Sequence, residues 1–543
     1  MCIRDSVVAT PAPAGEQPFL IRALDPNAKY GGTLIAAAHG PPAHFDLIGS
    51  PTIANHGIAG QMWENLLQLD PRTTVPSVIP SLAVRWEISP DFKTYSFDLR
   101  QGVMWSDGTE FTSADVKATY DRLRFPRADQ VSIRGAVYDS IAEINAPGKY
   151  EVDFVMSRPV AAESILPGFA MAWTEIVQKK TLDENNGDLH DVDVHPGTGP
   201  FRHVSRDEEG WVLEANPDHW NPYVPYLDGI KHIWVIAWTP ELSAMLFGGV
   251  VDWGRFVAQK DALSILRGEH PGLSARAENI PLGTLMPLNT ERLTDARVRK
   301  AIQIVVDQKA MNDVVSDLRG AVPGAWFIPG TPYAKPQSVL DATPGLRPPT
   351  AEDIELARQL MADAGYPNGE GFPTLFMPTR ETPSQRTQAP LIQAMLKDGL
   401  NIDVEISIED ASGIQLVVAE KTYDLLVQGE WNTPVPDPSI YLRSAYGVCG
   451  DAPCAFNLSL WNNPEYNALL EQFDAELDQE KRLEIADKMW DVLNREAPAD
   501  PRGSSENMYF AWKNDLKGGL PHGSTSGPSY NDLNRWDIQW LDR

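Results

Sequence analysis

Residues 94–100 alternate apolar and polar side chains, and this pattern limits the fold more than any other in the chain. Tyr95, Phe97 and Leu99 fall on one face, and the polar residues between them fall on the other. An alternation with a period of two predicts a half-buried β-strand. The pair Asp107–Gly108 predicts a turn shortly after it. The chain therefore leaves this strand within a few residues.

Helix patterns follow the strand pattern. Thr112 and Asp115 have the spacing of a capping box, which marks the start of a helix. Thr350 and Asp353 repeat this spacing, and Gly365 is placed to end the second helix. Strand and helix patterns that alternate over 543 residues predict α/β lobes with sheets covered by helices. Further helices are predicted after Asp295 and across Leu483, Ala486, Trp490 and Leu493.

The composition argues against several classes of function. The chain has 74 acidic and 46 basic side chains and a formal net charge of -28, which repels nucleic acids and anionic lipids. No apolar run approaches the ~18 residues of a membrane-spanning helix. A Walker loop and an H-E-x-x-H motif are both absent from the sequence. We therefore expect a protein that is not an enzyme, binds no nucleic acid and needs no cofactor.

Cys449 and Cys454 lie five positions apart in a loop rich in Gly and Pro. This spacing allows a small disulfide, which is expected if the protein is exported, but two free thiols are the alternative. A zinc site would need three or four ligands, and neither His nor another Cys stands beside the pair. No metal site is predicted here.

Several short motifs occur in a fixed order from about residue 30 to residue 500. Together they closely resemble family 5 of the extracytoplasmic solute-binding proteins, the receptors of dipeptide and oligopeptide ABC importers. The motifs are Gly31–Leu34, Trp63–Leu67, Pro80–Asp91, Tyr95–Gly102, Trp105–Gly108, Thr112–Val116, Gly197–Phe201, Asp295–Ala301, Ala362–Tyr366 and Arg495–Pro498.

The resemblance implies a two-lobed periplasmic-binding-protein fold of the class II type with an additional α/β domain. The ligand cleft would lie between domains I and III, with hinges near Thr198 and Asn289. We expect a flexible leader at residues 1–24, domain I at 25–65, 198–288 and 506–543, the additional domain at 66–197, and domain III at 289–505.

The resemblance also implies a function. The chain would be the monomeric substrate-binding subunit of an ABC importer. It would deliver a small organic solute, either peptide-like or another carboxylate-bearing molecule, to a membrane permease and its ATPase. A periplasmic or extracytoplasmic location rests on this resemblance alone, because no signal-peptide pattern is visible at the start of the sequence. The alternatives are a true peptide receptor, a secreted hydrolase on the same scaffold, and a solute sensor that contacts a membrane receptor.

The predicted ligand contacts begin in the segment around Trp431. In the dipeptide receptors of the family, an aspartate in this segment binds the amino group of the ligand, and here Pro434 occupies that position. Proline has neither a charge nor a donor, so an ordinary peptide ligand is in doubt. Asp437 or Glu430 is the candidate for an amine contact, and the alternative role of Asp437 is to cap the next helix. Trp431 is the candidate aromatic wall, with Asn432 beside it.

Arg380 resembles the arginine that the family uses to bind a ligand carboxylate. A guanidinium suits this role because its fork bonds both oxygens, and the alternative is an exposed loop arginine. In domain I, Thr52, Asn55 and His56 lie in a loop that faces the cleft in relatives. Trp253 is a weaker candidate near the second crossing between the lobes.

Two segments contain histidines, which are common metal ligands. The segment Asp188–His195 is rich in ligand-type residues, but it falls in the additional domain, and we expect a solvated acidic loop. His39 and His44 lie near the expected edge of the domain I cleft, where they could contact a metal-chelate ligand. Neither position is a predicted metal site.

Overall fold

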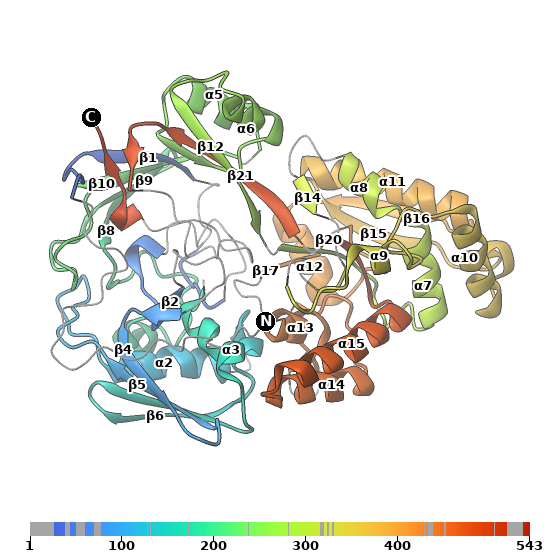
Figure 1. Cartoon of the computed structure of the whole chain (residues 1–543), viewed down its shortest axis with the longest axis horizontal. Helices are drawn as coiled ribbons and strands as arrows, with labels where there is room; N and C mark the ends of the chain where they lie inside the picture. Colours follow the sequence, from blue (N-terminus) through green and yellow to red (C-terminus); the bar gives the residue numbers. More distant parts are fainter. Residues whose placement is uncertain are drawn as a thin grey trace. The chain divides into compact units, whose positions relative to one another are not determined.

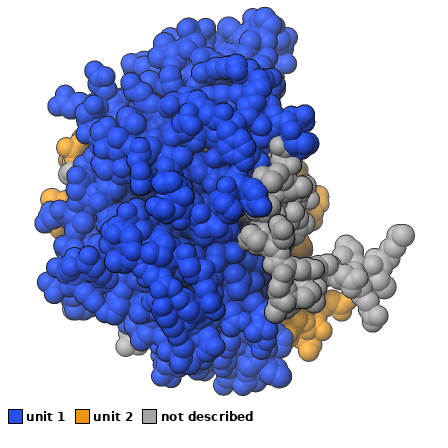
Figure 2. Space-filling view, turned by 90° about the vertical axis from the view of Figure 1, so that its left-hand side faces the viewer, with its two compact units in different colours: residues 1–278, 509–543 blue, residues 279–508 orange. Residues whose placement is uncertain are grey.

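A computed structural model shows two compact units, which Figure 2 distinguishes by colour. Unit 1 comprises residues 1–278 and 509–543, and unit 2 comprises residues 279–508. The structure describes residues 26–38, 44–49, 60–69, 78–127, 129–130, 132–171, 173–236, 238–280, 282–314, 320–322, 325–327, 331–427, 429–432, 438–449, 452–454, 456–503, 505–518 and 536–543. No helix within these ranges is long and apolar enough to cross a membrane.

The main sheet of unit 1 has the strand order β12-β21-β11-β1-β10-β9-β8. Strand β1 is parallel to both β10 and β11, whereas β10 and β9 are antiparallel. Helices α5 (Pro240–Phe247) and α6 (Gln259–Leu266) bury Leu242, Leu246 and Ile265 in a core cluster with Ala37 of β1. The strands are β1 (Thr33–Ala38), β8 (Phe201–Arg206), β9 (Gly210–Ala215), β10 (Gly229–Trp234), β11 (Trp253–Arg255), β12 (Leu273–Ile280) and β21 (Ser505–Lys513).

A second sheet of unit 1 contains the strand that the sequence pattern predicts. Its order is β4-β5-β7-β6, and β5 (Thr94–Leu99) buries its apolar face, as expected from the alternation. Helix α2 (Ser113–Arg124) packs on this sheet (Figure 1). It begins with the predicted capping box, in which Thr112 and Asp115 satisfy each other's backbone N–H groups. The other strands are β4 (Ala83–Ile88), β6 (Ile141–Gly148) and β7 (Glu151–Met156).

Unit 2 contains a three-stranded sheet in the order β17-β13-β20 and a parallel pair, β15 and β16. Helices α7, α10 and α11 pack with these strands around one core, which includes Ile302, Leu375 and Leu396. The predicted capping box at Thr350 and Asp353 begins α10, and Gly365, at φ 97°, follows its end. The elements are β13 (Leu282–Pro287), β15 (Leu375–Arg380), β16 (Val404–Glu409), β17 (Gly429–Asn432), β20 (Ala499–Gly503), α7 (Ala296–Val305), α10 (Ala351–Asp363) and α11 (Pro383–Leu400).

A second core of unit 2 is formed by the helices near the C-terminal end of that unit (Figure 1). Trp490 of α15 packs edge to face against Trp326, with 5.6 Å between the ring centroids. The helices are α13 (Ser439–Tyr446), α14 (Pro464–Ala475) and α15 (Gln479–Glu496). Shorter elements are β2 (Leu67–Leu69), β3 (Val78–Pro80), β14 (Gly320–Val322), β18 (Val448–Cys449), β19 (Ala452–Pro453), β22 (Leu516–Lys517), β23 (Trp540–Leu541), α3 (Ala162–Ile165), α4 (Lys179–Glu184), α8 (Gln308–Asp313), α9 (Gln337–Leu340) and α12 (Ala411–Glu420).

Candidate functional site

Arg380 is the last residue of β15, and its side chain is exposed. Its backbone N–H donates to Gln385 Oε1 at 2.9 Å, and the Thr379 hydroxyl lies 3.3 Å from the same oxygen. Gln385 belongs to the first turns of α11, so the strand end and the helix start are tied together. Among the described residues, none forms a hydrogen bond or ion pair with the Arg380 guanidinium. The group is thus exposed at a fixed backbone position, where it could bind an anion.

Asp424 fixes the opposite end of β15. Its Oδ2 accepts a hydrogen bond of 2.7 Å from the Phe376 N–H, and its Oδ1 accepts one from the Arg292 guanidinium. Two residues after Asp424, the Leu426 N–H donates to the Pro287 carbonyl of β13. The segment after Asp424 therefore connects β15 with β13 before the chain enters β17.

Strand β17 carries three of the predicted ligand contacts. Glu430, Trp431 and Asn432 lie in register with residues 284, 283 and 282 of β13. The structure thus places these three positions on the outer strand of a three-stranded sheet. Their role in binding stays a prediction. Asp437 and Pro434 lie outside the described residues.

Of the predicted contacts in unit 1, some lie outside the described residues and one, Trp253, lies within them. Thr52, Asn55, His56 and His39 lie outside the described residues. Trp253 is in β11, where it pairs with Trp512 of β21, and only 3% of its surface is exposed. Its ring centroid is 6.1 Å from that of Phe510. Trp253 therefore packs in the core in this structure, and its contact with ligand stays a prediction.

Cys449 and Cys454 form a disulfide across the hairpin of β18 and β19. The hairpin follows α13 directly, and the Cys454 N–H donates to the Gly447 carbonyl at 3.2 Å. The disulfide therefore fixes the chain just after the helix that follows the β17 segment.

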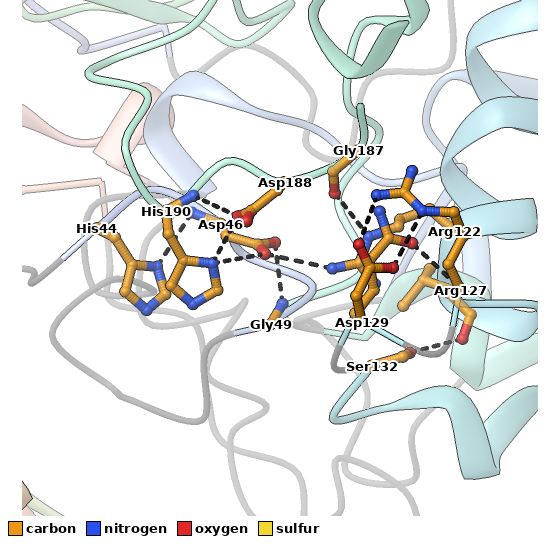
Figure 3. A network of polar contacts seen from close by, with 12 residues as sticks. His44, Asp46, Gly49, Arg122, Arg127, Asp129, Ser132, Gly187, Asp188 and His190 are labelled. Atoms are coloured by element: carbon orange, nitrogen blue, oxygen red, sulfur yellow. Dashed lines mark hydrogen bonds and ion pairs between the residues drawn. The ribbon is translucent and has the colours of Figure 1, made fainter. Parts of the chain in front are cut away.

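The acidic residues of the segment Asp188–His195 are exposed, as expected for a solvated loop, but His190 of this segment lies beside a buried carboxylate. His190 lies 3.5 Å from Asp46 Oδ2, and Asp46 is buried (Figure 3). Burial and the nearby His190 lower the pKa of His44, whose ring lies against that of His190. Sequence spacing does not predict this group, because its members come from two distant segments. Only the abundance of ligand-type side chains at 188–195 pointed toward it.

Comparison with known proteins assigns the family. The model of the bacterial extracellular solute-binding proteins, family 5, matches residues 77–452, which is more than half of the chain. The chain belongs to this family. The family predicted from the sequence motifs is therefore confirmed, and members of the family are binding proteins rather than enzymes.

Individual relatives cover nearly all of the chain. The dipeptide-binding protein of Escherichia coli K12 is 26% identical over 86% of this chain and 88% of its own length. Among solved structures, the binding protein AgaA of A. tumefaciens R10 in complex with agropinic acid has a TM-score of 0.80 at 24% identity, covering 94% of this chain and 99% of that one. DppA of Helicobacter pylori in complex with the peptide STSA has a TM-score of 0.78 at 22% identity, covering 95% and 99%.

These structural similarities confirm the predicted fold class. The chain has the mixed α/β fold of the two-lobed periplasmic solute-binding proteins. The domain boundaries predicted from the sequence remain predictions.

Proposed function

We propose that this protein is the substrate-binding subunit of an ABC importer and captures a small organic solute that carries a carboxylate. The family assignment supports the role in solute binding. The exposed Arg380 guanidinium at a fixed strand end supports the carboxylate. A guanidinium binds a carboxylate with two parallel N–H···O bonds, which gives both orientation and affinity.

Capture would occur outside the cytoplasm, by closure of the two lobes around hinges. The protein would then deliver the solute to a membrane permease, which works with its ATPase. Only the closed form completes the contacts with the solute, so binding shifts the population toward it. The resemblance to the family supports further ligand contacts beside Arg380. They are Thr52, Asn55, His56, Trp253, Glu430, Trp431, Asn432 and Asp437. The protein acts as a monomer and performs no chemistry on the solute.

The second candidate is a true peptide receptor with a different amine contact. The names of relatives do not decide between the two, because one is a dipeptide-binding protein and another is bound to agropinic acid at a similar identity. The observation that favours the second candidate is the presence of two acids, Glu430 and Asp437, near Pro434. Either acid could replace the aspartate that the dipeptide receptors place at this position.

Thermal melting against a ligand panel tests the proposal. The panel contains dipeptides, the peptide Ser-Thr-Ser-Ala, glutathione and agropinic acid, together with the C-terminal amide of each peptide and neutral sugars as controls. A ligand at about a hundred times its dissociation constant stabilises the folded state by about 2.7 kcal/mol. We expect at least one compound with a free carboxylate to raise the melting temperature. Its amide should raise the melting temperature by less.

The outcomes separate the candidates. Shifts with non-peptide acids alone support the first, whereas shifts with free-amine peptides support the peptide receptor. Equal shifts with a peptide and its amide would contradict the carboxylate contact. Turnover of a bound compound, followed by mass spectrometry, would contradict the assignment as a binding subunit.

A further inference from the structure

Two segments of unit 1 bring carboxylates and imidazoles together at one place (Figure 3). His44 and Asp46 follow β1, whereas Asp188 and His190 follow α4. The His190 Nδ1 lies 2.9 Å from Asp188 Oδ1 and 3.5 Å from Asp46 Oδ2. One ligand-type atom from each of Asp46, Asp188 and His190 lies within 4.8 Å of the others.

These spacings suit a transition-metal ion. Zinc binds imidazole nitrogen and carboxylate oxygen at about 2.0–2.2 Å, so ligand atoms at the corners of a tetrahedron lie about 3.4 Å apart. The two measured distances from His190 Nδ1, 2.9 and 3.5 Å, are on either side of this value. A small adjustment of the exposed Asp188 and His190 side chains would therefore bring all three atoms to one ion.

The charged groups around Asp46 only partly compensate its negative charge. Asp46 has only 1% of its surface exposed, and its neighbouring cation is Arg122, whose Nη2 lies 3.4 Å from Asp46 Oδ2. A charge-assisted hydrogen bond is shorter, about 2.7–2.9 Å, so this pair only partly compensates the buried carboxylate. Arg122 also donates to the Gly187 carbonyl at 2.8 Å. The other nearby arginine, Arg127, forms an ion pair with Asp129.

The backbone beside Asp46 keeps space for this arrangement. The Gly49 N–H donates to Asp46 Oδ1 at 3.0 Å, which leaves Oδ2 directed toward His190 and Arg122. A Cβ at Gly49 would lie 2.6 Å from Asp46 Oδ2 and 3.3 Å from the His190 ring. Glycine is thus the residue that lets this turn approach both candidate ligands.

We infer that Asp46, Asp188 and His190 form a binding site for a divalent first-row transition-metal ion, such as Zn²⁺, with water completing the coordination. One imidazole and two carboxylates are ligands that such ions accept. The ion would tie the segment after β1 to the loop after α4. This site is independent of the proposed solute contacts, so either proposal can fail without the other.

Competition with a coloured zinc chelator tests the site on the tag-free full chain after removal of metals. We expect one equivalent of Zn²⁺ to bind. His190→Gln and Asp188→Asn should each weaken this binding at least tenfold, since each removes one of three protein ligands. The matched control is Asp191→Asn, an exposed carboxylate of the same loop that lies outside the group, and it should leave binding unchanged.

Asp188 and His190 are partly exposed, with 63% and 47% of their side-chain surfaces accessible, so both variants are expected to fold. Melting of each variant without metal checks this expectation. X-ray absorption at the zinc edge of the unaltered protein gives a second readout, because the site requires one nitrogen ligand and several oxygen ligands. Zinc binding that is absent, or equal in all three variants, would overturn the inference.

Discussion

Arg380 combines a fixed backbone with a free side chain. The hydrogen bond from its N–H to Gln385 anchors the main chain, while the guanidinium is exposed and has no partner among the described residues. Structural arginines in the same unit look different. Arg299, for example, is buried and donates to the Leu293, Thr294 and Glu496 carbonyls. This difference is why we assign a binding role to Arg380 and a structural role to Arg299.

Replacement of Arg380 by alanine should weaken binding of a carboxylate ligand about tenfold to hundredfold. A hydrogen bond to a charged group contributes about 1.5–3 kcal/mol, and about 1.4 kcal/mol corresponds to a factor of ten. Calorimetric titration with the best ligand of the panel measures the change. Arg386→Ala is the matched control, since it removes an exposed arginine of α11. Equal affinities of the two variants would show that Arg380 does not bind the carboxylate.

Helices and strands were predicted best where the signal lies within a few neighbouring residues of the sequence. The strand at β5 and the two capping boxes of α2 and α10 depend on residues within a few positions of each other, and the structure contains all three. Hydrogen bonds between neighbouring residues follow directly from spacing, so the sequence is sufficient for them.

The group around Asp46 could not be predicted in this way. Asp46 and His190 lie far apart in the sequence but 3.5 Å apart in the folded chain, and no local spacing encodes that contact. The predicted ligand contacts present the same difficulty, because they rest on resemblance and come from separate segments of the sequence. Arg380 could be located at a strand end, but its lack of a partner appears only in the structure.

The hairpin of β18 and β19 gives a prediction at this scale. The disulfide closes a loop with a sequence separation of 5, and such a short loop restricts the unfolded chain only modestly. The Cys449→Ser/Cys454→Ser double variant should therefore lose about 2 kcal/mol of stability. Urea unfolding measures this loss. A reducing agent should destabilise the unaltered protein by a similar amount and leave the double variant unchanged, and equal effects of the reductant on both proteins would contradict the prediction.

The whole molecule consists of two units that each have their own core. The cluster around Leu242 and Ile265 belongs to unit 1, and the cluster around Ile302 and Leu396 belongs to unit 2. The chain passes between the units at residues 278–279 and 508–509. Separate cores allow each unit to move as a body while its internal packing is kept, which is the condition for hinge closure.

X-ray scattering of the full chain, with and without a saturating ligand from the panel, tests the central claim most directly. The proposed closure predicts that the radius of gyration falls when the ligand saturates the protein. It also predicts a smaller change when the amide analogue, which binds more weakly, is added at the same concentration. A ligand that binds saturably but leaves the radius of gyration unchanged would contradict capture by closure.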